Sequence, residues 1–487
     1  MKAITGLNTE DRDFFSIVIK AIYTNPFSDE RADILEQISP GFKHEGTIAP
    51  GLNKRIEQLK KKDLTKIQQL KGKDRHLVSH AFLYKTFLQF FSELDNLVHK
   101  QINQQDEPVG VSFAEQLIAQ LKSYGFAEQE CLRYLSLFYQ IRRAFYFIST
   151  ALVGNSQSMK QLRLALWNNV FTNDVLRYDQ HLWNRMEDFS TLLLGETGTG
   201  KGSAAAAIGR SGFIPFDLKK GQFKVNFTET FVTINLSQYP ESLIESELFG
   251  HRKGAFTGAV DDHEGLFERC SVYGSLLLDE IGDITIPVQI KLLQVLQERT
   301  FTSVGSHKKK RFAGRVIAAT NHSITELRKQ GNFRDDFFYR LCSDIITVPP
   351  LRQRVEESPS EIELLVNLLV TRITGEESPD LSGMILETLK RELPQNYPWP
   401  GNVRELEQAV RRILLTRHYD GDIMLKKPNL EQNFLDKFQT GTLEAKELLM
   451  QYCRLLYQRF GTYEEVARRT GLDRRTVKKY LKISDHF

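Results

Sequence analysis

Apolar residues recur at helical spacing through the first 150 positions of the chain. Residues 56–70, 80–100 and 130–150 each carry apolar side chains three and four positions apart, which gives a helix one apolar face. Residues 130–150 are apolar on nearly all sides, which predicts a buried helix. Strand-like alternation is weak in this region. The pattern therefore predicts an α-helical domain over 1–150 that contains a loop at 103–110.

The pattern changes near residue 152. Short apolar runs then alternate with helical stretches, and the runs are STLLLG, FVTINL, GSLLLDE and GRVIAATN. This alternation favours a parallel sheet with helices on both faces. After PPLRQR at 349–354 the spacing is helical again. We expect an α/β domain over 151–348, a helical domain over 349–430 and a compact all-α domain over 440–487.

Length and composition agree with a protein of several domains. The 487 residues exceed what one core accommodates, and contents of 41% hydrophobic and 26% charged residues are ordinary for a globular protein. The formal net charge of +4 is nearly balanced, so any nucleic-acid contact should come from a local patch. No apolar run approaches the roughly 18 residues of a membrane span, and the N-terminus carries acids early. These features predict a cytoplasmic protein.

The cysteines give no sign of a metal site. Cys131, Cys270, Cys342 and Cys453 lie far apart and form no CxxC pair. A zinc site and disulfides are therefore not expected, and reduced thiols fit best.

One glycine-rich segment follows the first apolar run of the α/β region. GETGTGK comes between that run and the alanine-rich stretch SAAAAIG, which predicts a strand, a loop and a helix in succession. Glycines let backbone N–H groups turn toward phosphates, and the lysine neutralises their charge at the helix N-terminus. The nucleotide-binding candidates are Gly195, Glu196, Thr197, Gly198, Thr199, Gly200, Lys201, Gly202 and Ser203.

Gly202 departs from the usual P-loop pattern. A Ser or Thr hydroxyl normally follows the lysine and binds Mg²⁺. Ser203 lies one position later, about 100° around the helix, and is a poor substitute. Magnesium must then rely on other ligands, and we expect reduced rather than absent ATPase activity.

Acids and an amide follow two later apolar runs. Asp279 and Glu280 end GSLLLDE, where Asp279 can bind a metal ion and Glu280 can polarise the attacking water. Asn321 ends RVIAATN, where a short amide can orient water or sense the γ-phosphate. Arg334 and Arg340 in FRDDFFYRL can reach a phosphate across a subunit boundary, although surface ion pairs are the simpler interpretation of that stretch alone.

Seven motifs together resemble a known family. GETGTGK, ESELFGHRKGAFTGA, GSLLLDEIGD, RVIAATN, FRDDFFYRL, PPLRQR and YPWPGNVREL occur in this order between residues 152 and 420. They resemble the AAA+ domain of bacterial enhancer-binding proteins, the activators of sigma-54 RNA polymerase. The resemblance implies an ATPase that uses ATP and Mg²⁺ and forms a homo-oligomer, from a dimer to a hexameric ring. Residues 1–150 would then be a regulatory domain and 349–430 the AAA+ lid.

The resemblance also implies roles inside one subunit. Lys201 would bind phosphates and Asp279 the magnesium ion. Glu280 would activate water, with Asn235 in FVTINL as its switch partner.

Further roles implied by the resemblance concern sensing and the neighbouring subunit. Asn321 would be the first sensor and Arg404 the second sensor, on the lid. Arg334 and Arg340 would be arginine fingers that complete the adjacent active site. The segment 167–188 is longer than the linker helix usual in this family.

The hexapeptide GAFTGA is close to diagnostic of the family. The resemblance implies that this loop rises when ATP is bound and contacts sigma-54. Its glycines permit the excursion and its aromatic side chain supplies contact area. The residues of this contact would be Gly254, Ala255, Phe256, Thr257, Gly258 and Ala259.

The C-terminal tail predicts a helix-turn-helix over 460–482. Val466 and Ala467 face inward, Gly471 makes the turn and Asp473 is a plausible N-cap. The tail resembles the Fis-type module that ends many such activators, and 443–460 resembles the preceding helix that pairs two subunits on DNA. Basic residues beside a hydroxyl suit phosphate contact and groove readout. The DNA-binding candidates are Arg474, Arg475, Thr476, Lys478 and Lys479.

Two other functions stay open at this point. A different AAA+ remodeller, such as an unfoldase, would have another pore loop and no DNA-binding tail. A DNA-binding regulator with an impaired ATPase is favoured only by Gly202. Residues 1–150 carry no recognisable phospho-acceptor pattern, so the signal, and whether the region represses or activates, are open.

Overall fold

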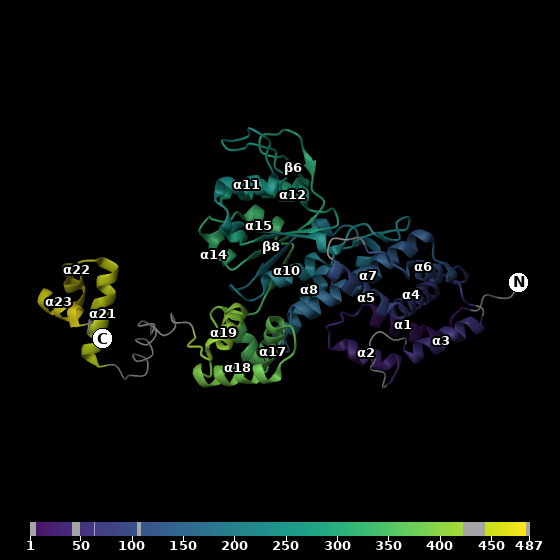
Figure 1. The fold of residues 1–487 in the computed structure, drawn as a ribbon, viewed down its shortest axis with the longest axis horizontal. Coiled ribbons are helices and arrows are strands. Elements are labelled where there is room, and N and C mark those ends of the chain that lie inside the picture. Colours follow the sequence, from purple (N-terminus) through teal and green to yellow (C-terminus); the bar gives the residue numbers. More distant parts are fainter. Residues whose placement is uncertain (1–5, 41–48, 63, 105–108, 422–443, 484–487) are drawn as a thin grey trace. The chain divides into compact units, whose positions relative to one another are not determined.

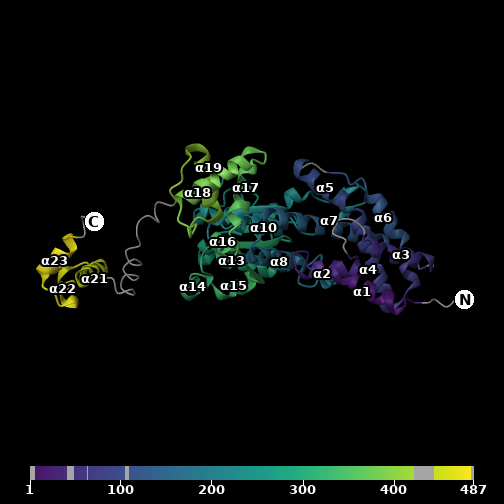
Figure 2. The same cartoon turned by 90° about the horizontal axis from the view of Figure 1, so that it is seen from below.

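Figures 1 and 2 show the computed structural model of the chain, which describes residues 6–40, 49–62, 64–104, 109–421 and 444–483. The chain divides into two compact units. The first comprises Met1–Leu386 with Asn396–Arg411, and the second comprises Glu387–Gln395 with Arg412–Phe487. No helix in these ranges is long and apolar enough to cross a membrane.

The described residues before Leu152 are built from helices. They are α1 (Thr9–Tyr23), α2 (Glu30–Ile38), α3 (Pro50–Lys61), η1 (Ile67–Gln69), α4 (Gly72–Gln89), α5 (Phe91–Gln104), α6 (Ala114–Ser123) and α7 (Glu128–Ala151). The helix α7 agrees with the prediction over 130–150, and it is buried along most of its length.

Two of the expected helices are interrupted. The pattern over 56–70 predicts one helix, but α3 ends at Lys61, and Leu64 and Ile67 turn into the core separately. The pattern over 80–100 is divided at Phe90, which is 2% exposed and stacks on Phe113 at 5.9 Å. At each break the chain turns. The turn lets large apolar side chains enter the core, which they would not reach from a straight helix.

A five-stranded parallel sheet forms the centre of the first unit. Its order is β4-β5-β8-β1-β9, so β1 and β5 both pair with β8. The strands are β1 (Thr191–Leu194), β4 (Phe231–Asn235), β5 (Ser275–Asp279), β8 (Arg315–Thr320) and β9 (Asp344–Thr347). Because all strand pairs are parallel, the residues that follow β1, β5 and β8 meet at one edge of the sheet.

Side chains alternate between two separate cores. Leu193, Leu277 and Ile317 point to one face and pack in a core shared with α7, α8 (Gln157–Phe171) and α10 (Lys201–Gly209). Leu192 and Leu276 point to the opposite face and pack against α11 (Glu241–Phe249), α13 (Ile286–Glu298) and α15 (Asp335–Leu341). The N-terminal helices therefore share one continuous core with the sheet, and α7, α8 and α10 lie together in Figure 1.

Polar contacts strengthen the junction between α7 and the end of α10. Arg143 is fully buried and donates to the carbonyl oxygens of Arg210 and Gly212 at 2.8 and 2.5 Å. Gln140 donates to the carbonyl oxygen of Ser211 at 2.9 Å. These donors satisfy backbone acceptors at and beyond the C-terminus of α10, as cationic side chains often do at helix ends.

Shorter elements connect the main ones. In the α/β region these are α9 (Val175–Arg177), a π-helical turn η2 (Tyr178–Leu182), η3 (Met186–Asp188), η4 (Phe227–Thr230), η5 (Leu236–Gln238), α12 (Leu266–Arg269), η6 (Ile281–Asp283) and α14 (Ile324–Lys329). Two small antiparallel pairs join β2 (Phe216–Asp217) to β3 (Gln222–Phe223) and β6 (Thr300–Phe301) to β7 (Lys310–Arg311).

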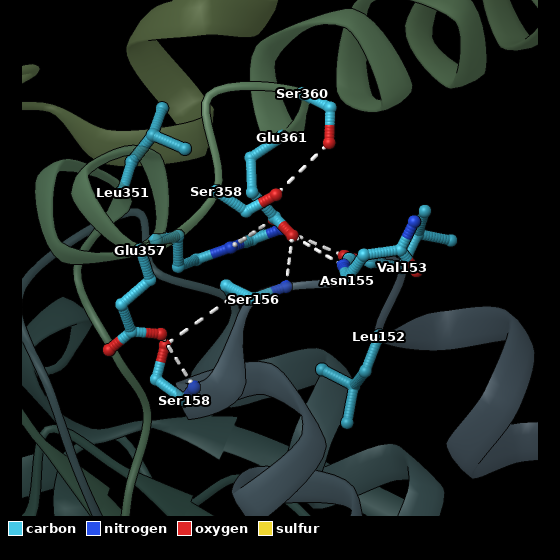
Figure 3. Close-up of polar contacts among 12 residues, drawn as sticks. Leu152, Val153, Asn155, Ser156, Ser158, Leu351, Glu357, Ser358, Ser360 and Glu361 are labelled. Atoms are coloured by element: carbon cyan, nitrogen blue, oxygen red, sulfur yellow. Dashed lines mark hydrogen bonds and ion pairs between the residues drawn. The ribbon is translucent and has the colours of Figure 1, made fainter.

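A buried ion pair fixes the segment between α7 and α8 to the helices that follow the sheet (Figure 3). Arg354 on α16 (Leu351–Glu357) and Glu361 on α17 (Glu361–Thr374) lie 2.7 Å apart, and both side chains are almost inaccessible. Glu361 accepts the amide N–H groups of Asn155 and Ser156, while Arg354 donates to the carbonyl oxygen of Val153 at 2.8 Å.

Five further helices complete the described residues. They are α18 (Pro379–Glu392), α19 (Asn402–Thr416), α21 (Ala445–Phe460), α22 (Tyr463–Thr470) and α23 (Arg474–Ile483), of which the last three form a small bundle in the second unit. Cys453, Leu456, Val466 and Val477 make the core of this bundle.

Candidate nucleotide-binding and remodelling site

The glycine loop connects β1 to α10 at the edge where the strands end. Gly198 and Gly200 adopt φ angles of +79° and +103°, which favour glycine because it lacks a Cβ atom. Gly198 also lies against the lid: a Cβ atom there would sit 2.2 Å from the carbonyl oxygen of Gly401. The predicted strand, loop and helix are thus present in this order.

Lys201 is held over the loop in the first turn of α10. Its Nζ donates to the carbonyl oxygens of Gly195 and Glu196 at 2.8 and 3.1 Å. Burial lowers the pKa of Lys201, while the nearby carboxylates of Glu280 and Asp279 act in the opposite direction. An ammonium group among loop carbonyls has the position from which it can turn to a bound polyphosphate.

The two acids and the sensor amide meet beside this loop. Asp279 ends β5, and Glu280 follows it in the left-handed region at φ +55°, uncommon for a residue with a side chain. The backbone N–H of Asn321 donates to Glu280 Oε2 at 3.3 Å, and its side-chain Nδ2 donates to Thr197 Oγ1 at 3.0 Å. Asn321 therefore joins the acid after β5 to the glycine loop after β1.

Asn235 lies next to Asp279 in the register of β4 and β5. Its side-chain oxygen accepts from the backbone N–H and the hydroxyl of Ser237 at 3.1 and 2.7 Å. In this structure the side chain therefore caps η5, and its role as a switch partner of Glu280 stays a prediction.

The two arginines of FRDDFFYRL bond within their own region. Arg334 pairs with Asp336 at 2.6 Å and keeps 40% of its side chain exposed. Arg340 donates from Nε and Nη2 to the carbonyl oxygen of Leu296 at 2.9 and 2.8 Å. Within the described ranges neither makes a hydrogen bond to the glycine loop or the two acids, so their action on a neighbouring subunit stays a prediction.

The start of α19 closes the loop from the other side. The backbone N–H of Val403 donates to the carbonyl oxygen of Gly198 at 3.1 Å, and a Cβ atom at Gly198 would lie 3.0 Å from the Cβ atom of Arg404. The charge of Arg404 is close enough to lower the pKa of Lys201. Arg404 is therefore near the phosphate-binding loop, as a lid arginine that senses nucleotide would be.

Two contacts to the loop were missed from the sequence. Asn402 donates to the carbonyl oxygen of Thr197 at 3.1 Å and to Glu196 Oε2 at 3.2 Å. Arg352 pairs with Glu196 at 2.5 Å and lowers the pKa of that carboxyl. Both residues belong to motifs visible in the chain, PPLRQR and PGNVREL, but nothing in their spacing indicates Glu196 as a partner more than 150 positions away.

The donor set fits a nucleotide with one metal ion held mainly by its phosphates. No group of three or more His, Cys, Asp or Glu residues in the described part of the chain could hold a metal ion. Magnesium in such sites uses one or two carboxylates together with substrate phosphates, and Asp279 supplies a carboxylate at the end of β5.

The GAFTGA segment forms an exposed loop between α11 and α12. Gly254 and Gly258 adopt φ angles of +79° and +102°, and the N–H of Gly254 donates to the carbonyl oxygen of Ala259 at 2.8 Å. Phe256 is 38% exposed, and its ring meets that of His251 edge to face with centroids 4.9 Å apart. Thr257 is exposed. The aromatic tip is therefore at the surface and not enclosed in the core.

The base of this loop is held by a neighbouring segment. The backbones of His251 and His263 form an antiparallel β-bridge, and the N–H of Arg252 donates to the carbonyl oxygen of Val304 at 3.0 Å. Asp262 accepts from the N–H of Lys253 at 2.8 Å. The base is thus fixed to a neighbouring segment, while the hydrogen bonds at the tip, from Ala255 N–H to Arg252 O and from Ala259 N–H to Phe256 O, stay within the loop.

In the C-terminal bundle, α23 begins as predicted. Asp473 accepts the N–H groups of Arg475 and Thr476 at 2.9 and 3.0 Å, so it caps the helix. Gly471 ends α22 at φ +69°. The Thr476 hydroxyl donates to Asp473 at 2.6 Å and is half-buried, so it serves this cap. The exposed basic side chains of α23 are Arg474, Arg475, Lys478 and Lys479.

A glycine loop after β1, a lysine in the next helix and two acids after the nearby strand β5 define a P-loop ATPase. Residues 173–347 match the sigma-54 interaction domain, and residues 356–452 match the AAA+ ATPase lid domain. The ATPase core of this chain is therefore an AAA+ sigma-54 interaction domain with its lid.

Three curated relatives support the same family. Regulatory protein AtoC from Escherichia coli (strain K12) is 38% identical over 51% of this chain and 50% of its own length. Nitrogen fixation protein AnfA from Azotobacter vinelandii is 36% identical over 59% and 51%, and DNA-binding transcriptional regulator NtrC from Azospirillum brasilense is 42% identical over 46% and 43%. The chain thus matches about half the length of each relative.

Proposed function

We propose that this protein is a sigma-54-dependent transcriptional activator that binds upstream DNA, oligomerises and uses ATP hydrolysis to remodel the polymerase complex. The observation that carries the proposal is that Lys201, Glu280 and Asn321 meet at one sheet edge in a sigma-54 interaction domain whose GAFTGA loop is exposed.

The chemistry follows from the groups at the sheet edge. Glu280 accepts a proton from water as the oxygen attacks the γ-phosphorus, the bond to the β–γ bridging oxygen breaks, and ADP leaves with its electron pair. Lys201 and the loop N–H groups stabilise the charge on the phosphates. Asp279 would hold a magnesium ion together with the phosphates, and the ion would supply further neutralisation of their charge. Asn321 bonds to both Glu280 and Thr197, so it can report the γ-phosphate to the acid.

The tip of the GAFTGA loop would transmit the effect of ATP hydrolysis to sigma-54. Among the described residues the Phe256 ring meets that of His251, and the glycines on either side of the Phe–Thr pair tolerate several backbone conformations. A rise of the tip requires loss of this ring contact and of few hydrogen bonds, so nucleotide state can shift the loop at modest energetic cost.

The C-terminal bundle supports DNA binding by a dimer. Four basic side chains project from α23, and on α21 Tyr452 and Leu455 are 44% and 45% exposed. Exposed apolar residues on one helix suit contact with a second copy. The pair of modules would then read a roughly palindromic site.

An impaired ATPase is the second candidate because Gly202 supplies no hydroxyl. The retained contacts of Lys201, Glu280 and Asn321 favour the active form.

Two variants of the full chain test the proposal. Glu280→Gln should lower ATP turnover by about a hundredfold or more while nucleotide binding persists, because it removes the base and not the cradle. Thr257→Ala should keep ATPase activity but abolish transcription from a sigma-54 promoter by purified sigma-54 holoenzyme. Thr233→Ala, an exposed threonine on β4, is the control.

The outcomes separate the candidates. Wild type and Glu280→Gln that are equally inactive on ATP would establish the impaired regulator. Unchanged transcription by Thr257→Ala would contradict the sigma-54 contact.

A further inference from the structure

A cavity lies at the opposite edge of the sheet from the nucleotide site. Its volume is about 250 Å³, and its lining comes from α7, α8, the segment around η2 and η3, the end of α10 with the residues after it, and the residues near the starts of β5 and β8. The lining side chains that carry its chemistry are Gln140, Tyr178, Trp183, Phe213, Tyr273 and Arg315.

Arg315 places an incompletely compensated cation at this cavity. It is 8% exposed, and its Nε and Nη2 donate to Phe189 O, Asn169 Oδ1 and Thr191 Oγ1 at 2.8, 2.8 and 3.0 Å. In the part of the chain that the structure describes, no carboxylate contacts this guanidinium and Nη1 makes no hydrogen bond. A buried charge without an ionic partner is costly, so an anion here would be strongly favoured.

The nearby acids are engaged elsewhere. Glu187 lines the cavity but pairs with the exposed Arg311 at 3.0 Å. Asp344 accepts from the Asn169 amide at 2.6 Å, and its charge acts on Arg315 without a direct contact. Neither carboxylate removes the need for an anionic partner.

The walls of the cavity are aromatic. The rings of Trp183 and Phe213 lie 4.6 Å apart at 60°, and Tyr178 and Tyr273 add further ring surface. An apolar cavity of about 150 Å³ accommodates benzene, so this larger one has room for a single ring with a carboxylate. Aromatic walls, one buried cation and this volume together define the ligand class.

We propose that this cavity binds a small aromatic carboxylate, whose ring packs between Trp183 and Tyr273 and whose carboxylate accepts from Arg315. The binding itself stands on these contacts alone. Its regulatory consequence rests on the ATPase proposed above.

The cavity adjoins the end of the P-loop helix. Gln140 donates from Nε2 both to Tyr178 Oη at 2.7 Å and to the carbonyl oxygen of Ser211 at 2.9 Å. Ser211 lies just beyond α10, whose first residue is Lys201. An occupant that changes the Tyr178–Gln140 contact therefore acts on the helix that positions Lys201, and should change the KM for ATP more than kcat.

Binding is measured directly with benzoate as probe. The chain has three tryptophans, and Trp183 lies in the cavity wall, so its fluorescence should respond saturably to benzoate and the response should be lost in Trp183→Phe. Benzyl alcohol has the same ring without the charge, and it should bind at least about tenfold more weakly.

A substitution that fills the cavity tests the proposed binding site without altering Arg315. Ala313→Leu adds volume at a half-buried lining position and should weaken benzoate binding at least about tenfold, whereas Ala119→Leu, at an exposed position on α6, should leave it unchanged. Far-ultraviolet circular dichroism confirms that both variants fold.

Each result is decisive for the site. Saturable binding that Ala313→Leu weakens and Ala119→Leu does not supports the proposal. No response of wild type to millimolar benzoate, equal affinity for benzyl alcohol, or equal binding by folded Ala313→Leu would overturn it. Because this assay needs neither ATP nor polymerase, it fails or succeeds independently of the proposed function.

Discussion

Gly202 occupies the position after the P-loop lysine, where a hydroxyl usually binds magnesium. It is exposed in the first turn of α10, and a Cβ atom there would meet nothing within 4 Å. The backbone thus accommodates a side chain at this position without rearrangement. The hydroxyl ligand is therefore absent because residue 202 is glycine, and not because of the conformation of the loop.

Gly202→Thr should lower the magnesium concentration for half-maximal ATPase activity by about fivefold, since one added ligand contact is worth about 1 kcal/mol. Gly202→Ala is the matched control, because it also removes the flexible glycine but adds no oxygen. The measurement is phosphate release against magnesium concentration. Equal curves for the Thr and Ala variants would show that the metal does not use this position.

His80 gives a second prediction at this scale. It is 7% exposed on α4, and its Nδ1 lies 2.7 Å from the carbonyl oxygen of His76. Burial lowers the pKa of His80 to about 4. The unfolded chain binds the proton more tightly, so stability is complete above about pH 6.5 and declines as the pH falls toward 4.

Between pH 7 and pH 5 this histidine alone should remove about 2 kcal/mol from the free energy of unfolding. His80→Gln should flatten that part of the dependence in urea unfolding experiments, whereas His181→Gln, at an exposed position, should retain it. A slope that His80→Gln leaves intact would assign the loss to other groups.

Many residues of the site could be predicted one by one from the sequence. Asp279, Glu280 and Asn321 follow apolar strands, and parallel pairing brings strand ends together. Asn402 and Arg352 were missed because their bonds to the glycine loop arise from tertiary folding and leave no local pattern. The bond of Arg340 to Leu296 was missed for the same reason.

At the scale of elements, helix and strand types were easier to predict than helix ends. The strands β1, β4, β5 and β8 and the helix α7 agree with the apolar pattern, and burial on two faces gives β1 and β5 a continuous apolar run. The strand β9 was not predicted, because three of its four residues are exposed and it has no such run. The break at Phe90 was not predicted, since helical spacing continues through it and only packing on Phe113 requires the turn.

The ion pair of Arg354 and Glu361 connects α16 and α17 to the segment before α8. Glu361→Gln should lower the free energy of unfolding by about 3–5 kcal/mol, because it leaves a buried guanidinium without a counter-charge. Glu356→Gln, exposed on α16, should change it by less than about 0.5 kcal/mol. Urea unfolding measures both.

A double variant tests whether charge or packing carries the effect. Arg354→Met with Glu361→Leu removes both charges and should recover part of the loss. If Glu361→Gln unfolds at the same urea concentration as wild type, the pair does not hold the segment in place.

At the scale of the whole molecule, the N-terminal helices form part of the ATPase core. Ala204 and Ile208 of α10 pack in the same cluster as Leu135 and Ile148 of α7. Removing 1–150 would expose this face, so loss of activity in such a truncation would not distinguish activation from unfolding. Substitutions at Gln140 or in the cavity are the sharper means of asking what the N-terminal region senses.

In the proposed ring, each active site contains residues from two neighbouring subunits. Arg334 is the better candidate for the shared residue, because 40% of its side chain is exposed and, in the part of the chain that the structure describes, its ion pair is with Asp336 two positions away. Arg340 already donates two hydrogen bonds to the carbonyl oxygen of Leu296. Lys201→Ala and Arg334→Ala proteins should each be inactive alone. Mixed in equal amounts, they should recover about a quarter of wild-type ATPase activity.

The fraction follows from counting sites. A productive site needs an intact loop from one subunit and an intact arginine from its neighbour, each present half of the time in a random mixture. Lys201→Ala mixed with Glu280→Gln is the matched control and should recover nothing, because both changes damage the same subunit's half of the site. If the Arg334→Ala mixture also stays inactive while the subunits still exchange, Arg334 acts within its own chain and the shared-site account of the ring is wrong.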